Sequence, residues 1–337
     1  MPGFLPGGDA CGVAFRRGCG KTGAMSDTWL GIEIGGTKLQ VVVGSAAGQI
    51  TERRRFTVVS EAGGEGIRRQ LAAALPELVE AHRPQGVGVG FGGPVDGRTG
   101  VIRCSHQIPG WEDFPLAEWL TEQTGCPARV DNDANVAALG EALAGAGRGR
   151  RVVFFSTLGS GVGGGLVAEG RIYHGAPPGE VEWGHLRLDR EGTIVEARCS
   201  GWAVDRRIRA LAEQHPESAL ARLTAGLKGG EARHWRAAIE AGDAVARALL
   251  ESVADDLAFG LSHVTHLLHP EVIVLGGGLS LVGELLRRAV ADALPPQIME
   301  AFRPGPEIRL AQLGEDSVPV GALLLAGTAG ETSEARA

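Results

Sequence analysis

Apolar and polar positions follow two different periods along this chain, which predicts a mixture of strands and helices. Short apolar runs that end at glycine or polar residues predict strands. We expect strands over residues 29–34, 38–43, 49–59, 86–91, 151–158, 162–168, 271–275 and 307–310. Apolar residues spaced three and four apart predict helices. We expect helices over residues 66–82, 201–214, 231–240, 243–268, 281–294 and 318–329, and another directly after residues 131–135.

One pattern occurs twice, first over residues 29–43 and again over residues 151–168. Each copy has an apolar strand, a glycine-rich turn with a hydroxyl residue, and a returning apolar strand. Two such units within mixed strands and helices predict a duplicated α/β architecture with a cleft between two lobes. A length of 337 residues allows each lobe its own core.

Composition and charge exclude several classes of protein. Hydrophobic residues make up 44% of the chain and charged residues 22%, as in ordinary globular proteins. The 33 basic and 40 acidic residues give a net charge of −7, and no basic block predicts a nucleic-acid partner. No apolar run is long enough to span a membrane. Five scattered cysteines argue against a disulfide framework and predict a cytoplasmic location.

The two ends of the chain lack the patterns of regular elements. Residues 1–24 contain glycine, proline, cysteine and several basic residues, without the apolar segment of a signal peptide. Met25 stands shortly before the first expected strand. We therefore expect residues 1–24 to be a disordered extension and residues 331–337 to be a tail.

Both glycine-rich turns have a composition suited to binding phosphate. Glycine at the tip of a turn exposes backbone N–H groups that form an anion site, and Thr or Ser adds a hydroxyl donor. An ordinary hairpin turn is the simpler explanation for either turn alone. The pair, with a third glycine run after an expected strand, favours a nucleotide site. Its expected residues are Gly35, Gly36, Thr37, Lys38, Gly159, Ser160, Gly161, Gly276, Gly277 and Gly278.

Neither turn matches two widespread nucleotide-binding motifs. The chain has no G-x-x-x-x-G-K-[ST] sequence, which excludes a Walker loop. Residues 159–164 differ in spacing from G-x-G-x-x-G, and a strand follows them where the Rossmann motif has a helix. Both of these nucleotide-binding motifs are therefore excluded for the two turns.

Polar residues are concentrated at residues 131–135, directly before an expected apolar helix. Asp and Asn are preferred at helix N-caps, but capping needs one such residue and four of these five qualify. Phosphoryl transfer to a hydroxyl requires a carboxylate that accepts the hydroxyl proton. We assign this role to Asp133, with Asn132 and Asn135 as partners of substrate hydroxyls or as residues that orient the site.

A third group of polar residues follows the second turn. It consists of Glu180, Glu182, His185 and Glu196. Carboxylates and imidazole exchange hydrogen bonds with vicinal hydroxyls, which suits a polyol ligand. A histidine on an apolar stretch is more often structural, so these residues leave both interpretations open.

Four motifs, in order, resemble those of the ROK family of bacterial sugar kinases and related repressors. They are residues 34–38, 132–135 with Glu141, 158–165 and 182–185, and the resemblance extends over residues 29–329. It implies the actin-like ATPase fold, a duplicated ribonuclease H-like architecture, with ATP, Mg²⁺, a hexose or amino sugar, and often a homodimer. It also implies Asp133 as the base and the following residues at or near the sugar: Gly93, Asp96, Asn132, Glu182, His185 and Glu196.

Within that fold we expect two lobes of unequal size. Residues 25–135 form the smaller N-terminal lobe, closed by a C-terminal helix over residues 317–330. Residues 136–316 form the larger C-terminal lobe. Cleft closure on binding is implied by the same resemblance.

Two side chains in the expected site differ from the family pattern. Glu33 stands where the family usually has Asp, so the geometry around Mg²⁺ and its waters is expected to shift. Gln107 stands where the family usually has Asn, so its hydrogen bonds to the sugar come from a longer side chain.

The family's zinc loop is also altered. Its Cys-x-Cys-Gly-x-x-Gly-Cys-x-Glu run is replaced by residues 190–196, in which Glu196 takes the place of the sugar-binding glutamate. Cys199 alone cannot complete a tetrahedral site, so we expect no structural zinc. Cys104, Cys126 and Cys199 are expected to be small buried residues.

The leading interpretation is an ATP-dependent hexose kinase, with glucose ahead of N-acetylmannosamine and fructose. A sugar-responsive repressor would need a DNA-binding domain, and the two dozen residues before the first expected strand do not resemble one. A non-catalytic sugar sensor would not need Asp133 and both glycine turns. Polyphosphate could replace ATP as the donor, although no basic groove is evident.

Overall fold

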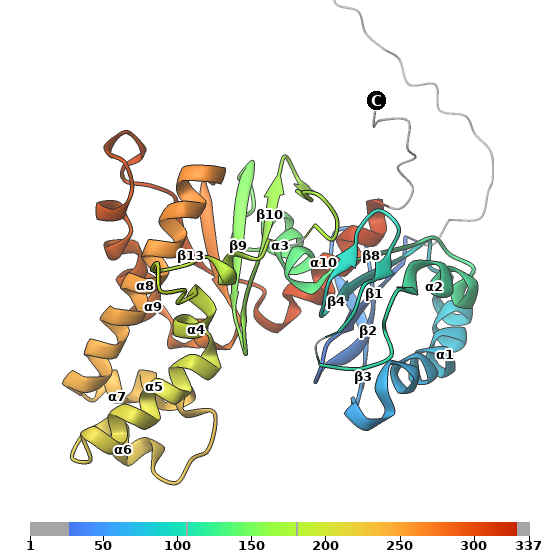
Figure 1. The fold of residues 1–337 in the computed structure, drawn as a ribbon. Helices are drawn as coiled ribbons and strands as arrows, with labels where there is room; N and C mark the ends of the chain where they lie inside the picture. Colours follow the sequence, from blue (N-terminus) through green and yellow to red (C-terminus); the bar gives the residue numbers. More distant parts are fainter. Residues whose placement is uncertain (1–26, 106, 180, 329–337) are drawn as a thin grey trace, which may run out of the picture.

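The computed structural model describes residues 27–105, 107–179 and 181–328. The expected extension over residues 1–24, Glu180 and the tail over residues 331–337 therefore lie outside the described residues. The described chain forms two five-stranded sheets that lie side by side, with two helices between them (Figure 1). In the part of the chain that is described, no helix combines the length and the apolar character required to cross a bilayer.

The two sheets have the same topology. The first has the order β3 (Ile50–Phe56), β2 (Leu39–Gly44), β1 (Trp29–Ile34), β4 (Val87–Phe91), β8 (Ala128–Asn132). The second has the order β11 (Arg171–Ile172), β10 (Val162–Ala168), β9 (Val152–Leu158), β12 (Val272–Gly276), β13 (Glu307–Leu310). In each sheet, the first three strands along the chain pair antiparallel. The last two strands pair parallel. The predicted duplicated α/β architecture is confirmed.

Helices cover both faces of each sheet. On the first sheet, α1 (Gly63–His82) and α2 (Leu116–Thr124) bury the side of β1 that carries Leu30 and Ile32, and α10 (Ser317–Gly327) lies on the other side. On the second sheet, α8 (Ala244–Leu268) and α9 (Glu284–Ala293) pack on one face and α3 (Asp133–Leu143) on the other. Apolar side chains between these layers form the cores.

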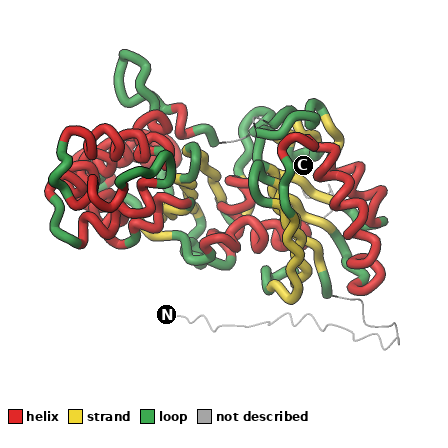
Figure 2. The backbone as a smooth tube through the Cα atoms, turned by 90° about the horizontal axis from the view of Figure 1, so that it is seen from below, coloured by secondary structure: helices red, strands yellow, loops and turns green. Residues whose placement is uncertain are grey.

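Short elements complete the two halves. A small sheet of β5 (Val95–Asp96), β6 (Val101–Ile102) and β7 (Phe114–Pro115) extends the first half. Around α8, the second half contains α4 (Val195–Cys199), α5 (Gly201–Gln214), α6 (Ala219–Thr224) and α7 (Trp235–Glu240). Figure 2 shows this concentration of helices in one half.

Helices α3 and α10 cross where the two halves meet (Figure 1). They approach so closely that a Cβ atom at Gly321 would lie 1.9 Å from the carbonyl oxygen of Val136. Glu141, fully buried near the end of α3, ties the helices together at one end. Its carboxylate accepts hydrogen bonds from Ser317 Oγ at 2.9 Å, at the start of α10, and from Leu313 N at 2.8 Å, in the segment before α10.

Several predicted boundaries are wrong for identifiable reasons. The strand predicted over residues 49–59 ends at Phe56. The helix predicted over residues 281–294 begins at Glu284, because Gly278–Val282 forms a 3₁₀ helix and Gly283 has a φ of 78°. The helix predicted over residues 231–240 is a 3₁₀ turn followed by α7. Helices α2 and α6, strand β8 and the small sheet were not predicted from the sequence.

Candidate active site

Asn132 and Asp133 lie at the junction of β8 and α3. Asn132 is the N-cap of α3, and its Oδ1 accepts hydrogen bonds from Ala134 N at 2.9 Å and Asn135 N at 3.3 Å. Its Nδ2 donates to the carbonyl oxygen of Gly93 at 3.1 Å. Capping therefore explains Asn132 directly and holds the next residue, Asp133, in a fixed position. The sugar contact of Asn132 stays a prediction.

Asp133 faces a cavity of about 250 Å³ that contains the second glycine turn. Thirteen residues line it: Asn132, Asp133, Ala134, Thr157, Gly159, Ser160, Gly161, Val162, Gly163, Gly164, Val181, Glu182 and Glu196. One wall is therefore the start of α3, and another is the β9–β10 hairpin. A carboxylate, a set of hairpin amides and two further acids share one small space.

The first glycine turn lies on the other side of Asp133. Gly92, which follows β4, is the link: a Cβ atom there would lie 3.4 Å from Asp133 Oδ2 and 3.5 Å from Gly35 Cα. The turn itself is closed by a 2.7 Å hydrogen bond from Gly35 N to Lys38 O. Asp133 thus lies between two hairpin turns that occupy equivalent places in the two sheets. Lys38 Nζ lies 3.5 Å from Glu315 of the segment before α10.

The third glycine run adjoins the second turn. Gly277 has a φ of 80°, and a Cβ atom there would lie 2.6 Å from the backbone of Leu158, directly before Gly159. Side chains at this position are excluded by both geometry and space. Residues 276–278 and 159–161 therefore form one continuous surface of backbone at the carboxyl ends of β9 and β12.

The expected sugar-binding residues divide into two groups. Glu182 and Glu196 line the cavity with Asp133, and Glu196 Oε2 accepts a 2.8 Å hydrogen bond from Val162 N. His185 and Gln107 are exposed and do not line this cavity. Gln107 instead lies over the first turn, where a Cβ atom at Gly36 would lie 1.6 Å from Gln107 Oε1.

Burial and like charges raise the pKa of Asp133 to about 6. Burial contributes most, and the carboxylates of Glu33 and, more weakly, Glu182 act in the same direction. Burial also raises the pKa of Glu33, against a 2.5 Å hydrogen bond from Gln40 Nε2. A carboxyl group whose pKa lies close to neutral pH is suited to accept a proton during reaction and release it afterwards.

The raised pKa of Asp133 predicts an acid limit to activity. Because only the ionised carboxylate can accept a proton, kcat/KM should fall about tenfold per pH unit below about pH 6. With a pKa of about 6, Asp133 becomes mostly neutral below about pH 6, whereas an exposed Asp stays ionised down to about pH 4. Initial rates measured from about pH 5 to about pH 8 test this. A profile that stays flat down to about pH 5 would contradict the assignment of Asp133 as base.

The cysteines are less buried than expected. Cys199 is buried, but Cys104 and Cys126 are only partly buried, so that prediction was wrong for these two. Cys126 follows the end of α2, where its Sγ donates to Pro84 O at 3.1 Å. Within the described ranges, no group of His, Cys, Asp and Glu has an arrangement that could hold a metal ion with three or more ligands.

The absence of the zinc-loop cysteines leads to a direct test. Metal analysis of protein purified without chelators should detect no stoichiometric zinc. A structural zinc site needs four ligands, and Cys199 is the single cysteine in residues 190–199. One zinc ion per chain would contradict our interpretation of residues 190–199.

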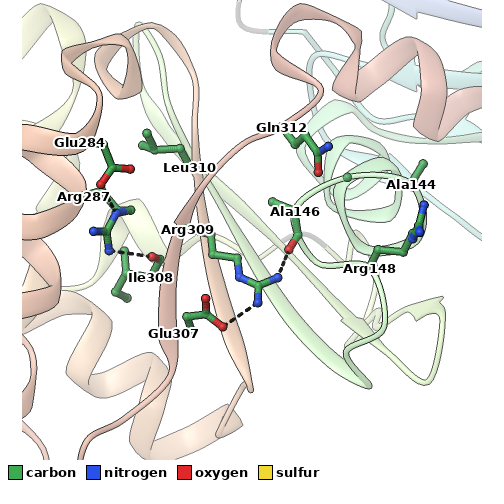
Figure 3. A pocket seen from close by; sticks show the side chains of 11 residues that line it. Ala144, Ala146, Arg148, Glu284, Arg287, Glu307, Ile308, Arg309, Leu310 and Gln312 are labelled. Carbon is green, nitrogen blue, oxygen red and sulfur yellow. Dashed lines mark hydrogen bonds and ion pairs between the residues drawn. The ribbon is translucent and has the colours of Figure 1, made fainter.

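A larger cavity of about 930 Å³ lies away from Asp133, between β13, α9 and the residues after α3. Figure 3 shows that Arg309, Arg287, Glu307 and Glu284 in this cavity contact their neighbours. Arg309 contacts Glu307 at 2.7 Å and Ala146 O at 2.6 Å, and Arg287 contacts Glu284 at 2.8 Å. The smaller cavity at Asp133 is therefore the better candidate for catalysis, in spite of its size.

Comparison with known proteins agrees with this arrangement. The sequence profile of the ROK family matches residues 29–329. The chain belongs to the ROK family. This ROK protein is 34% identical over 313 residues to a glucokinase of Halalkalibacterium halodurans, a match that covers 88% of this chain and 94% of the relative. A glucokinase of Thermotoga maritima is 31% identical over 301 residues, covering 87% and 95% of the two chains.

A solved structure gives the same result. A ROK family glucokinase from Streptomyces griseus, in complex with glucose and AMPPNP, matches with a TM-score of 0.75 and 31% identity. The match covers 89% of this chain and 99% of that chain. The family resemblance and the actin-like ATPase fold inferred from the motifs are therefore confirmed.

Proposed function

We propose that this ROK protein is a sugar kinase that transfers the γ-phosphoryl group of ATP to a hydroxyl group of a hexose. Glucose is the first candidate, because two relatives that match over most of their length are glucokinases. The observation that carries the proposal is the position of Asp133 in one cavity with the second glycine turn and beside the first.

Each part of the cavity has a role in this reaction. Asp133 accepts the proton of the attacking sugar hydroxyl, whose oxygen forms the new bond to the γ-phosphorus while the bond to the β-phosphate oxygen breaks. Backbone N–H groups of the two glycine turns hold the phosphates in place. Glu182 and Glu196 accept hydrogen bonds from other sugar hydroxyls and orient the reacting one.

The acidic residues near the first turn also fit a magnesium ion. Glu33 is partly buried, and burial raises its pKa. Its charge in turn raises the pKa of Asp133, so a bound cation would relieve an unfavourable concentration of negative charge. Mg²⁺ is commonly held by one or two carboxylates together with substrate phosphates. We propose that Glu33 holds it, directly or through water, where it would neutralise charge on the phosphates.

A coupled ADP-release assay over a panel of hexoses and N-acetylhexosamines tests the proposal. We expect saturable, sugar-dependent ADP formation that is highest with glucose. Preference for N-acetylmannosamine or fructose would retain the reaction and change the substrate. Sugar binding by calorimetry without any ADP release would identify a sensor instead and contradict the proposed reaction. Activity with polyphosphate but not ATP would reassign the donor.

We also propose that the protein acts as a homodimer in the cytoplasm. The support is the resemblance to ROK sugar kinases, which are frequently dimers, and the odd number of scattered cysteines. Sedimentation velocity over a range of protein concentrations measures the oligomeric state directly. A monomer at all concentrations would contradict the dimer.

A further inference from the structure

A histidine–carboxylate pair joins the two sheets next to the candidate site. His174 Nε2 lies 2.6 Å from Asp131 Oδ2. Asp131 is the penultimate residue of β8, an edge strand of the first sheet, and His174 follows β11, an edge strand of the second. The Asp131 side chain is 4% exposed and that of His174 is 34% exposed. Neither residue has a role in the mechanism above.

Asp131 also organises the residues that surround Asp133. Its Oδ1 accepts hydrogen bonds from Asn132 N at 2.8 Å and from Asn135 Nδ2 at 2.9 Å. Asn135 is fully buried, and its Nδ2 also lies 3.5 Å from the carbonyl oxygen of Gly179. One oxygen of the buried Asp131 carboxylate therefore holds Asn132 and Asn135, which flank Asp133 in the sequence, and the other oxygen contacts His174.

His174 begins the connection that leads to Glu182. This connection, residues 173–182, starts at the 2.8 Å hydrogen bond from Tyr173 N to Leu166 O. It ends at Glu182, which lines the cavity with Asp133. The connection thus meets the β8–α3 junction at two points: His174 contacts Asp131 in β8, and the carbonyl oxygen of Gly179 lies 3.5 Å from Asn135 Nδ2 in α3. Glu182 stands three residues after the second of these points.

The space around the pair is closely fitted. A Cβ atom at Gly97, in the β5–β6 turn, would lie 2.8 Å from His174 Nε2 and 3.2 Å from Asp131 Oδ2. Gly97 does not have a positive φ, so alanine at this position would cause no backbone strain. Its effect would come from steric contact with His174 and Asp131 alone. Gly175, the neighbour of His174, also lacks a positive φ, and a Cβ atom there would have open space for 4 Å around it.

We propose that Asp131 and His174 are positioning residues for the sugar, which hold Glu182 in register with Asp133 and so determine sugar affinity. The proposal rests on the proposed kinase function. Each glycine turn is closed by a backbone hydrogen bond of its own, from Gly35 N to Lys38 O and from Gly159 N to Gly161 O. The pair should therefore affect binding of the sugar and leave binding of ATP unchanged.

Steady-state kinetics of four variants tests the proposal. His174→Ala and Gly97→Ala should each raise KM for the sugar roughly tenfold, with kcat and KM for ATP within about threefold of the wild type. His174→Gln should restore sugar KM to within about threefold, because its amide can donate to Asp131 from a similar reach. Gly175→Ala, in the same connection, should behave as wild type.

A second pair of the same chemistry supplies a matched control. His82 Nε2 lies 2.8 Å from Glu52 Oε2, with a side-chain exposure of 28%, on α1. His82→Ala removes an equivalent contact and should leave all three kinetic constants unchanged. The proposal would be overturned if His174→Ala left KM for the sugar unchanged. It would also be overturned if the variant impaired KM for the sugar, KM for ATP and kcat to the same extent.

Hydrogen–deuterium exchange separates this proposal from the proposed function. In His174→Ala, peptides that cover residues 174–186 should exchange faster than in the wild type, and in His174→Gln they should not. This readout does not need turnover. If the wild type phosphorylates no sugar, the proposed function fails and the exchange data alone decide whether the pair holds the connection. Unchanged exchange in His174→Ala would overturn it.

Discussion

Asp133→Asn should lower kcat by about 10³-fold and leave the dissociation constant for the sugar within about threefold of the wild type. The asparagine keeps the shape of the side chain and its place between the two glycine turns, but it cannot accept the hydroxyl proton. General-base catalysis typically contributes about 10²-fold to 10⁴-fold, which sets this expectation. Single-turnover rates and titration calorimetry measure the two quantities separately.

Stability provides an internal check on this variant. Burial and the charge of Glu33 raise the pKa of Asp133 to about 6, so the ionised form is disfavoured in the folded state. Removal of that charge should therefore maintain or raise Tm at about pH 8, and the gain should disappear below the unfolded-state pKa of about 4. Asp292→Asn, at an exposed position of α9, is the matched control. A near-normal kcat in Asp133→Asn would contradict the assignment.

Glu141→Ala should destabilise the protein by about 4 kcal/mol. Its Oε1 accepts from Leu313 N and Ser317 Oγ, and its Oε2 accepts from Ala146 N at 2.9 Å and Gln312 N at 3.1 Å. Alanine leaves these donors without their acceptor at a site where the carboxylate is fully buried. Unpaired buried donors are costly because neither water nor protein replaces the lost bond.

The loss should be measurable as a reduction in Tm of roughly 10 °C and a lower urea midpoint. Glu141→Gln keeps one oxygen acceptor and should have an intermediate effect. Glu80→Ala, at an exposed position of α1, is the matched control and should change stability by less than about 0.5 kcal/mol. A Tm for Glu141→Ala equal to that of Glu80→Ala would show that the carboxylate does not stabilise the α3–α10 junction.

Local sequence patterns predicted the strands and helices that are strongly apolar. Strand β9 is mostly buried along its 7 residues, and α8 has an apolar stripe along 25 residues. Strand β8 was missed because only Val130 in it is a strongly apolar residue, and its last two residues are Asp131 and Asn132. The polar side chains at the end of this strand place it beside the candidate site, but they also interrupt the alternation of apolar residues by which a strand is predicted.

The candidate site was predicted as far as short motifs allow. Asp133 and the glycine turns stand in compact motifs, so their chemistry could be inferred from residue types alone. The Asp131–His174 pair joins residues 43 positions apart, and no local signal marks it. Gln107 was placed with the sugar by resemblance, yet its side chain lies over Gly36, because the loop after β6 reaches the first hairpin. Contacts of this kind depend on tertiary packing.

The close approach of α3 and α10 has a mechanical consequence. The backbones of Gly321 and Val136 lie against each other, so we expect this contact to be the pivot of any rotation between the two halves. Asp133 lies three residues before Val136, about 4.5 Å along the helix axis. Displacement in a rotation grows with distance from the pivot, so we expect the outer edge strands β3 and β13 to move through longer arcs than Asp133. The carboxylate that we propose as the proton acceptor would thus lie close to the pivot and keep its place while the more distant parts of the two sheets move.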